Sequence, residues 1–230
     1  GAVVVAATLK LRTLEGVQRP AIATVMPTPD RPFILIDAGA NTDCTPSMLV
    51  EFAVMGSVYS NMILHQEKPV IGLMSIGGED TKGNEITKEA FRLLSGSALN
   101  FRGNVEGHDL FRGQTDVVVC DGFVGNIVLK TSESVAHAVG QWSRQEFTRT
   151  PLRMVGALFL TRALKTMKHR LDPEMYGGAP LLGVNGVCII THGASSSRAI
   201  FHAMRVACES IHHHVNQAII ENVEKIGGTE

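Results

Sequence analysis

The sequence predicts an α/β protein with an open, mostly parallel, doubly wound sheet. Short segments rich in Val and Ile alternate with longer segments of helical spacing, and the order strand, loop, helix repeats along the chain. Segment 69–76 is nearly all apolar, which is typical of a strand buried on both faces. With 230 residues, of which 44% are hydrophobic and 19% charged, the chain can bury a substantial core.

The predicted elements alternate along the chain. Residues 2–11 are apolar, and their alanine content favours a helix over a strand. Pro27 and Pro29 mark a turn between the first two strands, and Pro46 starts a helix. The sequence predicts strands at 20–26, 33–37, 69–76, 100–105, 116–120 and 187–191. It predicts helices at 46–64, at 84–94, from the 121–125 turn to about 147, at 151–171, and from Ser195 onward.

The first seven residues, Gly1 to Ala7, form an apolar run with no strand before it. An apolar segment at a true terminus would have nothing to pack against. We therefore expect a single α/β domain over residues 1–230 that lacks its N-terminal part.

Composition excludes several classes of protein. The formal net charge of -1 provides no overall attraction to nucleic acid, so we expect no nucleic-acid partner. We find no apolar run of the roughly 18 residues that a membrane span needs. The four cysteines form neither a CxxC pair nor a zinc-finger spacing. We therefore expect reduced thiols and a cytoplasmic protein.

Polar, glycine-containing loops follow five of the predicted strands. They are Asp37–Asn41, Ile76–Glu79, Asn104–Gly107, Asp121–Asn126 and His192–Ser195. One such loop would more simply be a tight turn, since glycine tolerates positive φ. Open parallel sheets carry their sites at the carboxyl ends of strands, so we expect most of these loops to line one cleft. None contains a dinucleotide or P-loop fingerprint, but glycine turns and helix N-termini suit inorganic phosphate.

Five residues in these loops or shortly after them are the candidates for chemistry. Lys82 precedes a helix start, where its charge favours a phosphate oxygen or a developing oxyanion. The simpler alternative is a surface lysine, with Asn84 as a plain N-cap. Asp121 and Asn126 flank another helix start, and Asp121 could equally be only a cap. His192 follows a strand and could be a general acid or base, or a satisfied core histidine.

The sequence predicts no metal site and no cofactor. Three consecutive histidines, His212 to His214, point about 100° apart on a helix and so cannot chelate one ion. We expect them to form a solvent-exposed helix face.

Residues 147–171 contain no acidic residue and predict a basic amphipathic helix. Such a helix could be buried against a partner subunit. It could instead contact a membrane surface or an acidic partner protein. The residues expected to make that contact are Arg153, Phe159, Arg162, Lys165 and Lys168.

At these motifs the chain resembles the bacterial phosphate acyltransferase family of phospholipid synthesis, the PlsX type. The matching stretches are Arg19–Ala23, Asp37–Asn41 with Asp43 and Cys44, Phe52–Ser57, Lys82–Glu85, Asn104–Gly107, Asp116–Asn126, Tyr176–Gly186, and His192 with Gly193. The resemblance implies a fold like isocitrate and isopropylmalate dehydrogenases and phosphotransacetylases. It also implies a homodimer and a projecting helical hairpin over residues 127–172, whose tip contacts the membrane.

The resemblance further implies transfer of a long-chain fatty acyl group from acyl carrier protein to inorganic phosphate. The acyl phosphate would pass to a membrane glycerol-3-phosphate acyltransferase. Mapped onto the motifs, our hypothesis gives catalytic roles to Lys82, Asn84, Asp121, Asn126 and His192. It gives substrate or phosphate contacts to Gly1, Asn41, Gly77, Gly83, Glu85, Asn104, Gly122, Gly125 and Ser195.

Three alternatives stay open. A short-chain enzyme acting on coenzyme A thioesters would share the fold. The basic helix within residues 147–171 is only weak evidence against it. A dehydrogenase using NAD and a metal would share it too, but no acidic metal cluster is evident in the sequence. A non-catalytic scaffold that binds acyl carrier protein or membranes is the third.

Overall fold

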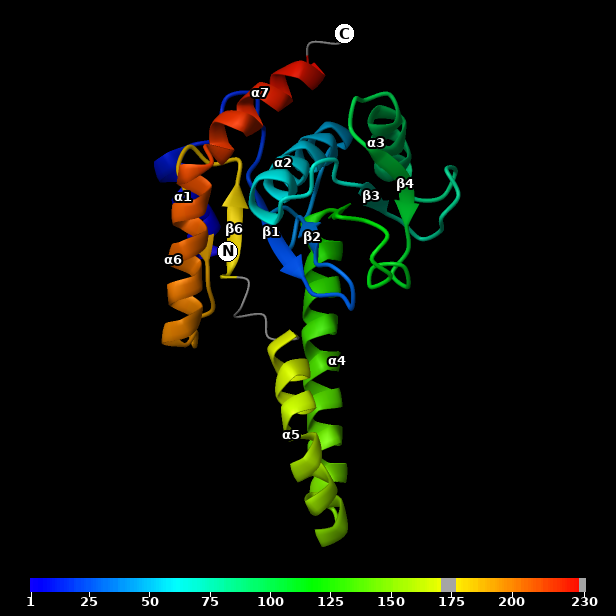
Figure 1. Cartoon of the computed structure of the whole chain (residues 1–230). Helices are drawn as coiled ribbons and strands as arrows, with labels where there is room; N and C mark the ends of the chain where they lie inside the picture. Colours follow the sequence, from blue (N-terminus) through cyan, green and yellow to red (C-terminus); the bar gives the residue numbers. More distant parts are fainter. Residues whose placement is uncertain (171–176, 228–230) are drawn as a thin grey trace.

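A computed structural model describes residues 1–170 and 177–227. Within them, seven strands form one sheet in the order β4-β3-β5-β2-β1-β6-β7 (Figure 1). The strands are β1 (Ala21–Met26), β2 (Phe33–Ile36), β3 (Ile71–Met74), β4 (Phe101–Val105), β5 (Val117–Val119), β6 (Ala179–Leu182) and β7 (Ile189–Ile190). The helices are α1 (Ala2–Leu11), α2 (Pro46–Leu64), α3 (Glu85–Ser95), α4 (Gly122–Thr148), α5 (Pro151–Arg170), α6 (Ser197–His212) and α7 (Val215–Gly227).

The sheet has a parallel part and an antiparallel part. Strands β4, β3, β5 and β2 run parallel to one another. Strand β1 pairs antiparallel with β2, β6 antiparallel with β1, and β7 antiparallel with β6. The predicted α/β sheet is therefore confirmed. It is a mixed sheet, because it contains both parallel and antiparallel strands. Because of these directions, β7 ends at the edge of the sheet where β2 begins.

Helices cover both faces of the sheet. Helix α2 lies on one face, with Phe52, Met55 and Tyr59 at most 1% exposed in the larger core cluster. Its N-cap Thr45 accepts a hydrogen bond from the Met48 N–H. The start of α4 covers the other face, where Val124 packs against a second apolar cluster. The sheet is thus doubly wound, as predicted.

Helix α2 corrects one expectation drawn from the sequence. Its 19 residues are long and apolar enough, by length and composition, to cross a membrane. However, 61% of its most apolar window is buried inside the protein. Its apolar character is explained by packing against the sheet and α7, as for a core helix.

Two further expectations are wrong in detail. The last helix is not continuous: α6 ends at His212, and His214 adopts a left-handed backbone with φ of 53° before α7 begins. The three consecutive histidines are exposed as expected, but they lie at a helix break. Strand β6 was not predicted, because Pro180 and the flanking glycines resemble a loop.

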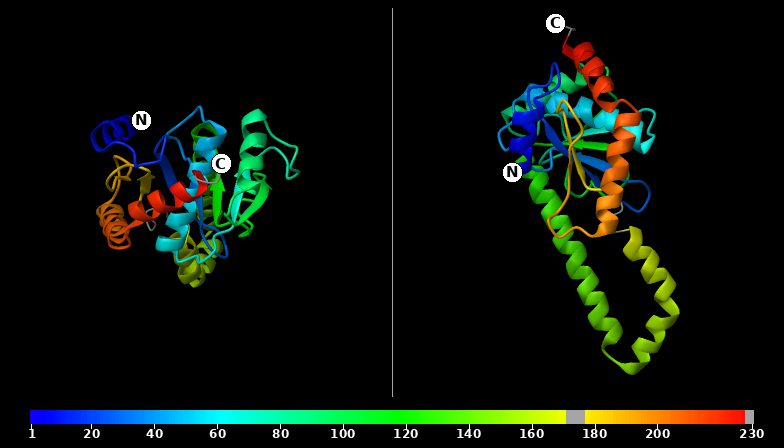
Figure 2. Two further views of the ribbon diagram at one scale, coloured as in Figure 1. Left: turned by 90° about the horizontal axis from the view of Figure 1, so that it is seen from above. Right: turned by 90° about the vertical axis from the view of Figure 1, so that its left-hand side faces the viewer.

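Helices α4 and α5 extend away from the sheet as a helical hairpin (Figures 1 and 2). Only the first turns of α4 pack on the sheet. Beyond them both helices expose large apolar side chains, including Trp142 at 63% and Phe159 at 86%.

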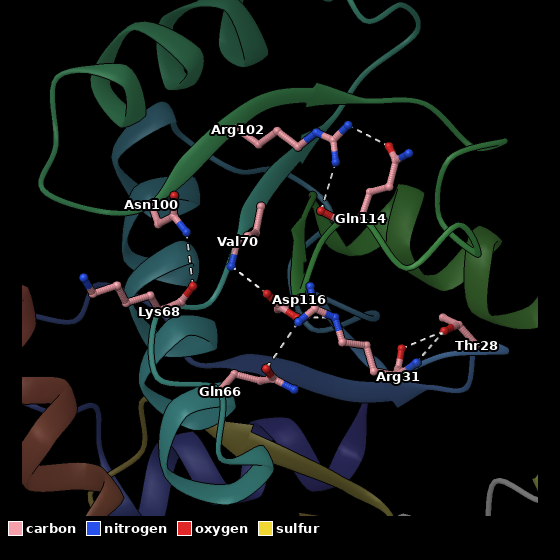
Figure 3. A network of polar contacts seen from close by, with 9 residues as sticks. All are labelled: Thr28, Arg31, Gln66, Lys68, Val70, Asn100, Arg102, Gln114 and Asp116. Atoms are coloured by element: carbon pink, nitrogen blue, oxygen red, sulfur yellow. Dashed lines mark hydrogen bonds and ion pairs between the residues drawn. The ribbon is translucent and has the colours of Figure 1, made fainter.

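The starts of the parallel strands are held together by a network around Asp116 (Figure 3). The buried Asp116 carboxylate accepts a 2.8 Å hydrogen bond from the Val70 N–H and lies 3.2 Å from Arg31 Nε. The Arg31 guanidinium also donates to Gln66 Oε1 at 3.4 Å. This network joins the segments that precede β2, β3 and β5. The candidate site lies at the opposite edge of the sheet, where these strands end.

Candidate active site

The loop that follows β2 is organised by the buried carboxylate of Asp37. Its Oδ1 accepts hydrogen bonds from the backbone N–H groups of Ile22, Gly39 and Ala40, at 2.9–3.1 Å. Its Oδ2 accepts the backbone N–H of Asn41 at 2.7 Å and the Asn41 side-chain amide at 2.9 Å. Burial is the largest influence on the pKa of Asp37 and raises it, whereas these hydrogen bonds lower it. The carboxylate therefore acts as an internal scaffold for the loop.

The N-terminus of α4 packs directly on this loop. Asp121 caps the helix, its Oδ1 accepting from the Val124 N–H at 2.8 Å. The Gly122 N–H donates to the Asn41 carbonyl at 2.6 Å, and a Cβ at Gly122 would lie 2.7 Å from that oxygen. Only glycine permits this approach. As a result, the exposed Asn126 on the next turn lies over Gly39.

A second polar group forms at the end of β3. Asn84 is the N-cap of α3, and its Oδ1 accepts from the Thr87 N–H at 2.8 Å. Gly83 has φ of 114°, which favours glycine and turns the chain into the helix. The aliphatic part of Lys82 lies across Gly77, since a Cβ there would be 2.8 Å from Lys82 Cγ. Among the described residues, the Lys82 ammonium makes no ion pair, so its charge is available at the helix N-terminus.

The end of β4 completes this second group. The Asn104 amide donates to the Glu79 carbonyl at 2.8 Å, and the Gly78 N–H donates to Glu106 Oε1 at 3.1 Å. Within the described chain, two buried polar atoms nearby, Ser75 Oγ and Asn104 Oδ1, have no hydrogen-bond partner. Unpaired buried oxygens are costly and uncommon. These two oxygens can therefore still accept hydrogen bonds.

Four of the five predicted loops share one edge of the sheet. They follow β4, β3, β5 and β2, which are parallel and adjacent. The starts of α3 and α4 therefore lie at this edge, where helix N-termini favour anions. No hydrogen bond or ion pair between the Lys82 loop and the Asp37 loop is recorded in the described chain. Strand β5 lies between β3 and β2, so the two loops are one strand apart at the same edge, and each is held by its own contacts.

The fifth loop is not at this edge, which corrects the expectation of a shared position. His192 and Ser195 follow β7, whose direction places them at the opposite edge. His192 is exposed, and its Nδ1 accepts the Ala194 N–H at 3.1 Å. Gly1 begins α1, which lies beside β6 rather than at the four loops (Figures 1 and 2). Roles for these three residues stay predictions.

Some predicted phosphate contacts have structural roles instead. Both hydrogens of the Asn41 amide are donated inside the protein, to Asp37 and to the Pro20 carbonyl. The Gly122 and Gly125 N–H groups donate to the Asn41 and Asp121 carbonyls. These amides are therefore not free to bind an anion, and the glycines serve the close packing of α4.

The two cysteines beside this loop are unsuited to nucleophilic chemistry. Burial, together with the nearby charges of Asp37 and Asp121, raises the pKa of Cys44 to about 12. Cys120 is buried too, and burial raises the pKa of its thiol. Because the thiolate is the nucleophile, neither side chain is activated at neutral pH.

One group of side chains has the composition of a cation site. Glu106, His108 and Asp109 offer ligand atoms within 4.8 Å of one another. The sequence did not predict it, because their spacing matches no metal motif. All three are at least partly exposed, and such acidic groups are common without a bound ion.

A family model described as a fatty acid synthesis protein matches residues 1–218. The chain belongs to this family. Curated phosphate acyltransferases are close relatives: that of Acidobacterium capsulatum is 49% identical over 219 residues, covering 95% of this chain and 65% of the relative. That of Nitratiruptor sp. is 47% identical over 227 residues, covering 98% and 68%. The chain spans about two thirds of the length of these relatives. The resemblance to the phosphate acyltransferase family is confirmed.

Solved structures support the fold expected for this family. A phosphotransacetylase from Streptococcus pyogenes aligns over 93% of this chain and 58% of its own, with a TM-score of 0.55 and 17% identity. A branched-chain phosphotransacylase from Enterococcus faecalis V583 aligns over 84% and 65%, with a TM-score of 0.51 and 17% identity. At such identity the likeness shows the fold alone, which is the predicted phosphotransacetylase-like fold.

Of the remaining predicted contacts, Glu85 lies at the same edge and the others lie on the hairpin. Glu85 is in the first turn of α3 and pairs with Lys88 at 3.7 Å. On the hairpin, Arg153 forms an ion pair with Glu146 of α4, which also pairs with Arg149 at 3.2 Å. Part of the predicted basic charge is thus neutralised by the neighbouring helix. Phe159, Arg162 and Lys165 are exposed, and the Lys168 side chain lies outside the described residues.

Sequence reasoning assigned no individual role to Asp37, Ser75 or Glu106. All three lie in or beside loops that it did single out. Their burial and hydrogen-bonding state depend on partners from distant segments, which spacing alone does not reveal.

Proposed function

We propose that the protein transfers a fatty acyl group from the thioester of acyl carrier protein to inorganic phosphate, giving acyl phosphate and a free thiol. The observation that carries the proposal is the joint placement of Lys82, Asn84 and Asn126 at one edge of the sheet, at the N-termini of α3 and α4. Helix N-termini with an unpaired lysine suit a dianionic substrate.

The chemistry needs positioning more than acid–base groups. A phosphate oxygen attacks the thioester carbonyl, and a tetrahedral oxyanion forms. The carbon–sulfur bond then breaks, and the thiolate leaves without a strong general acid because its pKa is only about 8.5. Lys82 binds the phosphate or the oxyanion, and the amides of Asn84 and Asn126 donate hydrogen bonds. Asp121, which caps α4, holds Asn126 in place rather than reacting.

The family model and the relatives' name, phosphate acyltransferase, support the reaction class. The carrier protein, the long acyl chain, the homodimer, membrane contact and transfer to a glycerol-3-phosphate acyltransferase are part of the proposal. The exposed apolar hairpin supports the last three, because a partner or a membrane surface would bury it.

The test is phosphate-dependent release of thiol from palmitoyl-acyl carrier protein, with the acyl phosphate trapped by hydroxylamine. We expect Lys82→Met to lower kcat/KM by roughly a hundredfold or more, because one lost donor to an oxyanion costs that much. Lys68→Met, at the opposite edge of the sheet, is the matched control and keeps the wild-type rate.

Three outcomes would contradict the proposal. Turnover that persists in Lys82→Met would remove the residue at its centre. Turnover of acetyl-coenzyme A but not of the carrier thioester would favour the short-chain enzyme. Binding of the acylated carrier without any phosphate-dependent thiol release would favour a non-catalytic scaffold.

A further inference from the structure

An exposed apolar surface borders the polar residues of the candidate site. Ile76 is 83% exposed, Phe123 60% and Ile127 49%. All three lie within the site loops or directly beside them. Ile76 precedes Gly77 at the end of β3, while Phe123 and Ile127 flank Asn126 on the first turns of α4.

The three side chains lie close in sequence to residues that pack against a buried apolar cluster. Met74 of β3 and Val124 and Val128 of α4 pack against the same cluster beneath the sheet. Ile76 lies two residues after Met74, in the bend that follows β3. Phe123 and Ile127 are four residues apart and therefore neighbours on the surface of α4. The end of β3 and the start of α4 share one edge of the sheet, and exposed apolar side chains lie at both places.

Polar and apolar groups alternate along this surface. Asn126 lies three residues after Phe123, on the same helix face, and Lys82 lies across Gly77, next to Ile76. A ligand with an anionic or carbonyl head among the polar groups would lay an attached aliphatic chain over the apolar ones. An acyl thioester and an acyl phosphate both have this form.

We propose that Ile76, Phe123 and Ile127 form the subsite for the acyl chain of the substrate. This inference rests on the proposed function and adds the place where the chain binds. The surface is partly open, so each methylene gains less than the roughly fourfold in affinity that complete burial of a CH₂ provides.

The first test measures binding without turnover. Octylphosphonate and butylphosphonate carry the same head group and differ by four methylenes, and calorimetry gives both affinities. We expect octylphosphonate to bind at least tenfold more tightly to the wild-type chain. In Phe123→Ala and in Ile76→Ser we expect that ratio to fall below threefold, with butylphosphonate affinity unchanged within twofold.

Phe201→Ala is the matched control, because Phe201 is 65% exposed on α6, away from the site loops. It should keep the wild-type ratio. All these side chains are exposed, so the variants fold, and circular dichroism verifies this. A ratio near one in the wild type, or a ratio that neither substitution changes, would overturn the subsite. So would a wild-type dimer that Phe123→Ala converts to monomer in light scattering, because a second copy would then cover the surface.

The two proposals fail in different ways. Chain-length-dependent phosphonate binding that needs Phe123, without thiol release from any thioester, would keep the subsite and reject the reaction. Phosphate-dependent turnover with no preference for octylphosphonate would keep the reaction and reject the subsite.

Discussion

One oxygen of the Asp37 carboxylate, Oδ2, accepts two hydrogen bonds from Asn41, one from its backbone N–H at 2.7 Å and one from its side-chain amide at 2.9 Å. Asn41 in turn accepts the Gly122 N–H at 2.6 Å. A buried carboxylate thus sets the loop on which α4, and with it Asn126, is seated. The position of a candidate catalytic residue therefore depends on a side chain that does not face the solvent.

We expect Asp37→Ala to lower the free energy of unfolding by about 3 kcal/mol or more, because several buried N–H groups lose their acceptor. Asn41→Ala should cost less, about 1–2 kcal/mol, since only the amide hydrogen bonds are lost. Urea denaturation of both variants and of the double variant measures the coupling between them. Strictly additive effects would show that the two residues act independently.

Gly122→Ala should destabilise the protein by about 1–3 kcal/mol, because its Cβ would meet the backbone of Asn41 and force α4 away from the loop. The matched control lies on the same helix. Gly140 has nothing within 4 Å of an added Cβ, so Gly140→Ala should stabilise the helix by about 0.5–1 kcal/mol. Urea denaturation measures both changes. Equal effects of the two substitutions would contradict the close approach.

Asp116→Ala should lower the free energy of unfolding by about 2–4 kcal/mol, because the Val70 N–H loses a buried acceptor and Arg31 loses its ion pair. Arg31→Ala should cost about 1 kcal/mol, since its side chain is 42% exposed. Thermal and urea unfolding report both values. A loss below about 0.5 kcal/mol in Asp116→Ala would show that the network in Figure 3 contributes little.

The cysteines should differ in their reactivity toward iodoacetamide at pH 8. Cys208 is exposed and should be labelled first, whereas Cys44 and Cys120 are buried with raised pKa values and should react slowly. In urea all four should react, which intact mass and peptide mapping can follow. Rapid native labelling of Cys44 would contradict the structure.

The raised pKa of Cys44 also has a consequence for stability at high pH. Its folded value of about 12 lies above the ordinary value of 9.0, so above pH 9 the thiol ionises first in the unfolded chain. The free energy of unfolding should therefore fall as pH rises above 9. Cys44→Ala should weaken this dependence, which urea titrations between pH 8 and 10 would detect.

Local patterns were enough to locate most elements of this protein. The sequence placed Asn84 and Asp121 as possible N-caps, and both cap helices in the structure. It also placed the start of α2 at Pro46 and the start of α5 at Pro151. Capping and proline effects act within a few residues, so spacing along the chain reveals them. The family, too, followed from motifs in the sequence.

Only the tertiary structure decided which loops lie at the same edge of the sheet. Strand directions depend on pairing between distant segments, and the antiparallel β1, β6 and β7 put His192 at the opposite edge from Lys82. The role of Asp37 likewise depends on donors that lie up to 15 residues away, and the exposure of Phe123 depends on how α4 sits on the loop. The sequence by itself determined most of the elements, two of the helix caps and the family. Long-range packing decided which polar groups share an edge, because strand direction depends on pairing between distant segments and not on any local period.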